Sequence, residues 1–231
     1  MTSPQQKPAQ PEKRTALVAG STGLVGGQLL RVLLDAPEYG RVYAISRRPL
    51  SFDHPRLANR ILQFDTLGTA LKGLSCDDAY CCLGSTRAAA GSDAERRRVD
   101  VDLVLAFARA ARAAGAQRFI VISSAGASAT ARNPYLRAKA EMEQGLRGLG
   151  FASLDILQPG LLLGSRAELR PLELIATVVA PLVNPLLRGR YAAWRAIAAR
   201  DVARAMLAAA RSRRRGVYAY FGEGLRALVN Q

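Results

Sequence analysis

A glycine-rich turn between a predicted strand and a predicted helix places the strongest constraint on this chain. Residues 15–19 form a short apolar run, Thr-Ala-Leu-Val-Ala, that is typical of a buried strand. Glycines follow at positions 20, 23 and 26, and leucine and valine then recur with helical spacing from residue 29 to residue 33. A strand, a glycine turn and a helix N-terminus favour binding of a dinucleotide pyrophosphate, because unpaired backbone N–H groups face the anion. The alternative is an ordinary strand-to-helix turn, in which glycine is also common.

The three glycines have distinct expected roles. Gly20 permits the tight turn, and Gly23 lets the backbone approach the pyrophosphate. Gly26 lets the helix lie close to the strand. We therefore expect nucleotide binding to be the anchor of this chain's function.

Strands and helices alternate along the rest of the chain. The predicted strands cover residues 41–46, 61–64, 79–83, 119–122 and 154–157, with a last short strand at 217–221. The predicted helices cover residues 93–114 and 134–146, and another begins near Asp201, whose side chain is placed to cap it. The alternation predicts an α/β fold, a doubly wound parallel sheet of the Rossmann type with a small C-terminal substrate region.

One domain accounts for the chain from residue 14 to residue 231, with the substrate region at 160–200. Residues 1–13 are polar and rich in proline and glutamine, which predicts a disordered leader. Residues 172–187 are strongly apolar, but the segment is too short for a membrane span, carries Glu173 and is broken by Pro181 and Pro185. A buried helix and loop is the favoured interpretation, and an interfacial or dimer contact in a homo-oligomer is the alternative.

The charge and the cysteines limit the partners and the compartment. A net charge of +15 invites a nucleic-acid interpretation, but arginines dispersed among alanines and the lack of a basic motif with interleaved aromatics argue against specific nucleic-acid binding. We expect at most weak peripheral membrane association.

Three cysteines, two of them adjacent, indicate a reducing compartment, and we expect a cytoplasmic protein. The single histidine and the absence of a Cys/His cluster predict no metal site.

The end of the second predicted strand bears on the choice of nicotinamide cofactor. NAD-selective folds place an acid ~20 residues past the glycines, where it binds the ribose hydroxyls. Here Ser46 occupies that position and is followed by Arg47 and Arg48, two guanidinium groups that can pair with a 2′-phosphate. The pattern predicts NADP(H) in preference to NAD(H), although a solvated loop is the alternative. Asp65, after the third predicted strand, is placed to meet the adenine edge.

A Tyr-x-x-x-Lys pair provides the candidate chemistry. Tyr135 and Lys139 lie four residues apart at the start of a predicted helix, so both side chains share one face. An ammonium beside a phenol favours the phenolate, and a phenol tuned in this way can donate a proton to a carbonyl as hydride arrives from nicotinamide. Ser123 and Ser124 end the preceding strand, where a hydroxyl can hold the same carbonyl oxygen.

These motifs together resemble the atypical short-chain dehydrogenase/reductases, the group that includes the Tat-interacting protein and NAD-dependent epimerase/dehydratase-like bacterial proteins. The matching segments run in family order and cover nearly everything after residue 14. They are residues 20–26 (Gly-Ser-Thr-Gly-Leu-Val-Gly), 82–87 (Cys-Leu-Gly-Ser-Thr-Arg), 123–127 (Ser-Ser-Ala-Gly-Ala), 135–139 (Tyr-Leu-Arg-Ala-Lys), 158–164 (Gln-Pro-Gly-Leu-Leu-Leu-Gly) and 199–203 (Ala-Arg-Asp-Val-Ala).

The resemblance implies a set of cofactor contacts beyond the glycines. Lys139 would hold the nicotinamide ribose. The remaining implied contacts lie at three segments: Ser21, Thr22, Leu24 and Val25 at the pyrophosphate; Leu83, Gly84, Ser85 and Thr86 on the adenosine side; and Pro159, Gly160, Leu161 and Leu162 beside the nicotinamide.

Three departures from the family pattern leave two functions open. Tyr135 follows Ser124 by only 11 residues, so either serine is a candidate to face the nicotinamide, and Gln158 stands where related chains often have arginine. The segment after residue 164 is short for a nucleotide-sugar substrate. The leading hypothesis is an NADP-dependent oxidoreductase that acts on a small carbonyl or alcohol substrate. The alternative is a non-enzymatic NADPH-binding regulatory or assembly protein.

Overall fold

A single parallel sheet forms the centre of the protein. The computed structural model describes residues 13–62, 66–67, 71–84, 92–163 and 195–230. Seven strands pair side by side in the order β3-β2-β1-β4-β5-β6-β9, and every pairing is parallel. Their bounds are β1 Arg14–Ala19, β2 Tyr39–Ser46, β3 Leu57–Ile61, β4 Asp78–Cys81, β5 Arg118–Ile122, β6 Ser153–Gln158 and β9 Gly216–Phe221. A separate two-residue ladder joins β7 (Leu162–Leu163) to β8 (Ile197–Ala198).

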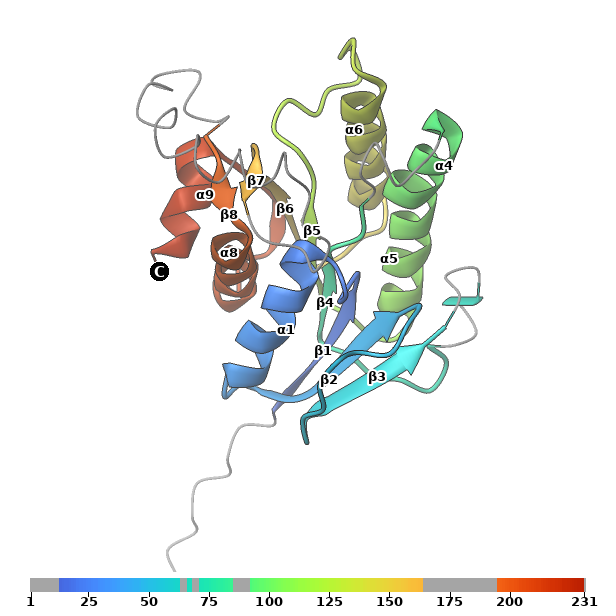
Figure 1. The fold of residues 1–231 in the computed structure, drawn as a ribbon, viewed down its shortest axis with the longest axis vertical. Coiled ribbons are helices and arrows are strands. Elements are labelled where there is room, and N and C mark those ends of the chain that lie inside the picture. Colours follow the sequence, from blue (N-terminus) through green and yellow to red (C-terminus); the bar gives the residue numbers. More distant parts are fainter. Residues whose placement is uncertain (1–12, 63–65, 68–70, 85–91, 164–194, 231) are drawn as a thin grey trace, which may run out of the picture.

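Helices cover both faces of the sheet (Figure 1). One face carries α1 (Leu24–Asp35), α8 (Ala199–Arg211) and α9 (Gly222–Val229); the other carries α4 (Asp93–Arg97), η2 (Arg98–Asp102), α5 (Leu103–Ala113) and α6 (Pro134–Arg147). Strand β1 shows why both faces need cover, because Ala16 and Val18 pack into the core beneath α1 and α8 whereas Leu17 and Ala19 pack into the core beneath α5 and α6. The predicted doubly wound α/β fold is confirmed.

The strand order fixes where a ligand can bind. From β1 the chain moves outward through β2 to β3, whereas β4 lies on the other side of β1 and the order then continues to β5 and β6. In parallel sheets of this kind, the crevice for a ligand opens at the carboxyl ends of the strands where the order reverses. Here that point lies between β1 and β4.

The third strand is displaced from its predicted position. The apolar run at residues 61–64 suggested the strand, but the strand is β3, Leu57–Ile61, and Ile61 is 56% exposed. An edge strand pairs with only one neighbour and tolerates polar residues, so apolar patterning misplaces it. The fourth strand is also shorter than predicted and ends at Cys81 rather than at residue 83.

The long helix predicted at residues 93–114 is three segments. A π-helical turn, η2, interrupts it between α4 and α5. Within this turn the consecutive residues Asp100 and Val101 are both buried. A wider turn of this kind often marks a functional site, and 3.6-residue periodicity cannot reveal it.

Two features of the C-terminal part also differ from expectation. The N-cap of α8 is Ala198 and no side chain caps the helix, so Asp201 is not the cap; it lies in the first turn, where the helix dipole favours a carboxylate. Helix α9, which contains Gly222 and Gly224, was missed because glycine lowers helix propensity.

None of the helices within the described ranges is long and apolar enough to cross a membrane. Residues 1–12, which make up the predicted leader (1–13) except for Lys13, and residues 164–194, which include most of the predicted substrate region, lie outside the described residues.

Candidate cofactor and active site

The glycine turn closes tightly against the end of β4. Gly20 adopts a φ of +80°, and the carbonyl oxygen of Gly20 accepts a hydrogen bond of 3.0 Å from the N–H of Gly23. A Cβ at Gly20 would lie 2.6 Å from the backbone of Cys82, and a Cβ at Gly26 would overlap the carbonyl oxygen of Gly20. Glycine at both positions is therefore required by the close approach of α1, β1 and the chain after β4.

The N-terminus of α1 fits a pyrophosphate. Its N-cap is Gly23, no side chain of the described residues caps the helix, and no acidic residue stands in its first turn. The first-turn N–H groups therefore remain for an anion, which the helix dipole also attracts. Thr22 and Gly23 are exposed beside this end, and Leu24 is partly buried. Val25 belongs to the core, and the hydroxyl of Ser21 donates to the carbonyl of Ile45 at 3.3 Å, which fixes the turn to β2.

The end of β2 carries exposed arginines. Arg47 and Arg48 are exposed, whereas Ser46 is only 3% exposed. The Ser46 hydroxyl lies 2.6 Å from the carbonyl oxygen of Arg48 and 2.8 Å from Oδ1 of Asn59 on β3. The serine therefore braces the loop that presents the two guanidinium groups, and its hydroxyl is engaged by the protein.

A buried ion pair holds the candidate lysine. The ammonium of Lys139 on α6 lies 2.7 Å from Oδ1 of Asp100 in the π-helical turn, and both residues are at most 2% exposed. A Cβ at Gly84, just after β4, would lie 3.4 Å from Asp100 Oδ1 and 3.8 Å from Lys139 Nζ. The pair thus lies directly behind the backbone at the carboxyl end of β4. Sequence reasoning missed Asp100, because only a π-helical turn directs it toward α6.

The charge state of Lys139 follows from two opposing effects. Burial is the largest single influence and lowers the pKa of the ammonium, but the Asp100 carboxylate, together with Tyr135 and Cys81, raises it, and the net pKa lies above its ordinary value. A raised folded-state pKa means that the pair stabilises the protein throughout neutral pH and loses its effect as the pH rises above the ordinary value of about 10.4.

Substitution of Lys139 by methionine is expected to destabilise the protein by about 3–5 kcal/mol, because it leaves a buried carboxylate without its cation. The double variant Lys139→Met/Asp100→Leu should recover most of that loss, since an apolar pair of similar size carries no uncompensated charge. Urea denaturation at neutral pH measures both effects. Equal stability of Lys139→Met and wild type would show that the pair is not the buried unit described here.

Tyr135 stands in the first turn of α6 and is partly buried. Asn133 caps the helix by accepting a 3.0 Å hydrogen bond from the Tyr135 N–H, and Pro134 occupies its first position. The Lys139 ammonium lies 5.7 Å from the centroid of the Tyr135 ring. Tyr135 and Lys139 are therefore adjacent on one face of α6, as the spacing predicts, although the ammonium is directed to Asp100.

The two candidate serines have different surroundings. The buried Ser123 hydroxyl donates a 2.5 Å hydrogen bond to Oε1 of Glu143, which also accepts one of 2.8 Å from Gln158. Ser124 is partly buried, and among the residues that the structure describes its hydroxyl makes only a long contact of 3.4 Å with the carbonyl of Ala125. Ser124 is therefore the serine whose hydroxyl is available at this edge. The role of Gln158 is to hold the Glu143 carboxylate.

The chain after β6 lies beside Ser124. The N–H of Ala125 donates to the carbonyl oxygen of Pro159 at 2.9 Å. Leu161 is 54% exposed, and its carbonyl accepts a 2.9 Å hydrogen bond from Ile197. Of the residues assigned to the chain after β4, Leu83 is buried and Gly84 is exposed. Of those assigned to the chain after β6, Gly160 and Leu162 are partly buried. Asp65, Ser85 and Thr86 lie outside the described residues.

The carboxyl edge of the sheet therefore brings four predicted segments together: the glycine turn, the chain after β4, the serines after β5 and the chain after β6, with α6 at their side. The model of one protein family, described as "NAD dependent epimerase/dehydratase family", matches residues 16–219 of this chain. The chain belongs to this family. The membership confirms the resemblance inferred from the motifs, including the expectation of a Rossmann-type, nicotinamide-dinucleotide-binding protein.

Curated relatives include the proteins named "Protein FMP52, mitochondrial" in Saccharomyces cerevisiae and "Protein fmp52, mitochondrial" in Aspergillus clavatus. The first is 34% identical over 178 residues, covering 76% of this chain and 77% of the relative. The second is 36% identical over 182 residues, covering 76% of this chain and 78% of the relative. Because these relatives are named mitochondrial, the expectation of a cytoplasmic protein is wrong. It rested on the number and spacing of the cysteines, which do not distinguish one reducing compartment from another.

Solved structures share the fold. MoeE5 in complex with UDP-glucuronic acid and NAD superposes with a TM-score of 0.68 at 21% identity, covering 93% of this chain and 81% of that chain. The Bordetella bronchiseptica enzyme WbmH in complex with NAD+ gives 0.69 at 15% identity, covering 95% and 80%. At these identities the similarity establishes the Rossmann-like fold alone.

Proposed function

We propose that this chain is an NADP(H)-dependent oxidoreductase that interconverts a small carbonyl compound and the corresponding alcohol. The observation that supports it most strongly is the packing of the Lys139–Asp100 pair directly behind Gly84, next to the glycine turn. That packing brings Tyr135, four residues before Lys139, to the same edge as the candidate pyrophosphate site. A phenol and a dinucleotide site at one sheet edge are the minimum for carbonyl reduction.

Each residue has a defined task in this proposal. When bound, NADPH supplies the hydride that the carbonyl carbon accepts. The Tyr135 hydroxyl donates a proton to the carbonyl oxygen, and Ser124 holds the same oxygen by a hydrogen bond. Lys139, fixed by Asp100, keeps α6 and its phenol in register with the edge of the sheet. Glu143 accepts from Ser123 and so holds the turn that carries Ser124.

The preference for NADP(H) rests on the end of β2. No carboxylate follows Ser46 to repel a 2′-phosphate, and the exposed Arg47 and Arg48 can pair with one.

We expect Arg47→Ala to weaken NADPH binding at least tenfold and to leave NADH binding nearly unchanged. The reason is that one charge-assisted phosphate contact contributes about 1.5–3 kcal/mol. Calorimetry with both cofactors measures the two affinities. Arg112→Ala, which removes an exposed guanidinium from α5, is the matched control for total charge. Equal wild-type affinities for NADPH and NADH would contradict the preference.

A screen of small aldehydes, ketones and quinones with NADPH tests the activity itself, with NADPH consumption followed by absorbance. Oxidation of NADPH that requires both the protein and a carbonyl compound supports the proposal. If the protein binds NADPH tightly but reduces none of these compounds, the alternative of a non-enzymatic NADPH-binding regulatory or assembly protein takes precedence.

A further inference from the structure

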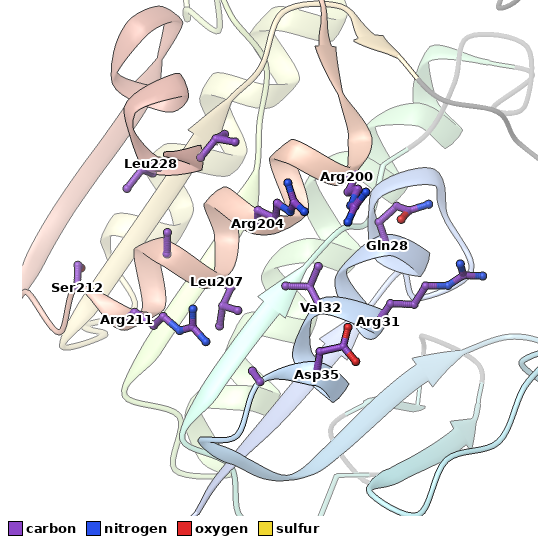
Figure 2. Close-up of a pocket in the computed structure, with 13 residues that line it drawn as sticks. Gln28, Arg31, Val32, Asp35, Arg200, Arg204, Leu207, Arg211, Ser212 and Leu228 are labelled. Carbon is purple, nitrogen blue, oxygen red and sulfur yellow. The ribbon is translucent and has the colours of Figure 1, made fainter. Parts of the chain in front are cut away.

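A second candidate binding site lies on the helical surface, away from the carboxyl edge. A pocket of about 770 Å³ opens between α1 and α8, with α9 closing one side (Figure 2). Its volume lies within the ~300–1,000 Å³ of ordinary small-molecule sites. Its lining includes none of the residues assigned above to cofactor or catalysis. We call this pocket the α1–α8 groove.

The groove has an excess of positive charge without partners. Arg31 on α1 and Arg200 and Arg204 on α8 line it, and within the described residues none of the three makes a hydrogen bond or an ion pair. Arg200 and Arg204 stand four residues apart, where like charges on a helix repel each other. Figure 2 shows both side chains at one end of the groove, close to Gln28. An anion bound there would relieve the repulsion.

The far end of the groove has a different character. Arg211 lines it, but its guanidinium is paired with Glu38 at 2.7 and 3.2 Å. Asp35 also lies at this end (Figure 2). Acidic groups at the far end disfavour a second anion, so the anion site is confined to the Arg200–Arg204 end.

Apolar side chains line the groove between its two ends. Leu207 of α8 lies opposite Val32 of α1 (Figure 2), and Leu228 contributes to the lining from α9; both leucines are buried. Arg200 and Leu207 stand seven residues apart on α8, a rise of about 10 Å. The groove therefore offers guanidinium groups at one end and an apolar surface beside them.

We propose that the α1–α8 groove binds a single molecule of an anionic amphiphile, a phosphate monoester that carries an apolar chain. Guanidinium groups bind phosphate through paired N–H donors, and two adjacent arginines match its double charge. The apolar lining accommodates the chain, whereas nucleic acid offers no such group. A flat bilayer cannot enter a concave pocket, so the ligand is a monomer. The site is distinct from the glycine turn and does not depend on the proposed reductase activity.

Octyl phosphate, kept below its micelle concentration, is a suitable probe for calorimetry with the full chain. It should bind at least tenfold more tightly than inorganic phosphate or 1-octanol, because only octyl phosphate fills both parts of the groove. The double variant Arg200→Gln/Arg204→Gln should weaken binding at least tenfold. The matched double variant Arg109→Gln/Arg112→Gln, which removes two exposed charges from α5, should bind within twofold of wild type. Excess NADP+ should not compete.

Four results would overturn the proposal. If octyl phosphate binds no more tightly than inorganic phosphate, the apolar lining does not contribute to binding. Equal losses of octyl phosphate affinity in the two double variants would show that binding depends on net charge alone. Competition by NADP+ would place the ligand at the glycine turn. Binding to vesicles of an acidic phospholipid without any binding of monomeric octyl phosphate would indicate a membrane surface instead.

Discussion

Tyr135→Phe is expected to lower NADPH-dependent turnover by roughly 10²–10⁴-fold, the usual size of a general acid–base contribution. The substitution removes only the phenolic oxygen, which acts in the transition state. Cofactor affinity should therefore stay within a few-fold of wild type, and the Lys139–Asp100 pair should persist because it does not involve that oxygen. Steady-state kinetics on any carbonyl substrate found in the screen, together with NADPH titration, measures both quantities.

A tyrosine outside the site provides the control for general damage. Tyr218→Phe removes a phenol on β9 whose hydroxyl donates to the carbonyl of Arg215, and should leave turnover unchanged. Ser124→Ala should lower turnover, because its hydroxyl is available at the carboxyl edge. A substrate whose reduction survives Tyr135→Phe would remove this residue from the mechanism.

Gly23→Val is expected to abolish NADPH binding, a loss of more than a hundredfold or about 2.7 kcal/mol. Gly23 is the exposed N-cap of α1, so a side chain there would occupy the space in front of the first-turn N–H groups. Its φ of −78° and ψ of 171° are accessible to valine, so the backbone itself is not strained. The added Cβ would lie 3.1 Å from the carbonyl oxygen of Gly20, a tight contact that requires this oxygen to move by a few tenths of an ångström, so the fold of the variant is measured as well.

Gly27→Val is the matched control, because a Cβ at Gly27 meets its nearest neighbour, the carbonyl of Ser21, at an ordinary 3.7 Å. It also introduces valine into α1, but not in front of the helix N-terminus. Thermal unfolding of both unliganded variants shows whether either substitution disrupts the fold. Normal NADPH binding by Gly23→Val would mean that the glycine turn is only structural.

The sequence predicted the fold because its strongest signals are local. The apolar run of β1, the glycine turn and the periodic face of α1 are contiguous in the chain, and each follows from backbone geometry. The Tyr135–Lys139 pair was predictable for the same reason, since a spacing of four residues fixes both side chains on one helical face.

The missed features depend on contacts between distant segments. Asp100 reaches Lys139 only because a π-helical turn interrupts the helix, and helical periodicity gives no sign of it. Asn59 meets Ser46 because β3 begins four residues earlier than its apolar pattern suggests. The hydrogen bond between Ser123 and Glu143 joins a strand end to the middle of α6, so the serine with the available hydroxyl was identified only in the structure.

We expect NADP(H) to bind at the glycine turn with its nicotinamide beside Tyr135 and Ser124. A crystal structure of the full chain with NADP+ tests it most directly. We predict the pyrophosphate at the N-terminus of α1, the 2′-phosphate against Arg47 or Arg48, and a pocket that opens beside the nicotinamide and is lined by Tyr135 and Ser124. A complex in which the cofactor lies elsewhere, or in which the Tyr135 hydroxyl is out of reach of the nicotinamide, would contradict the claim.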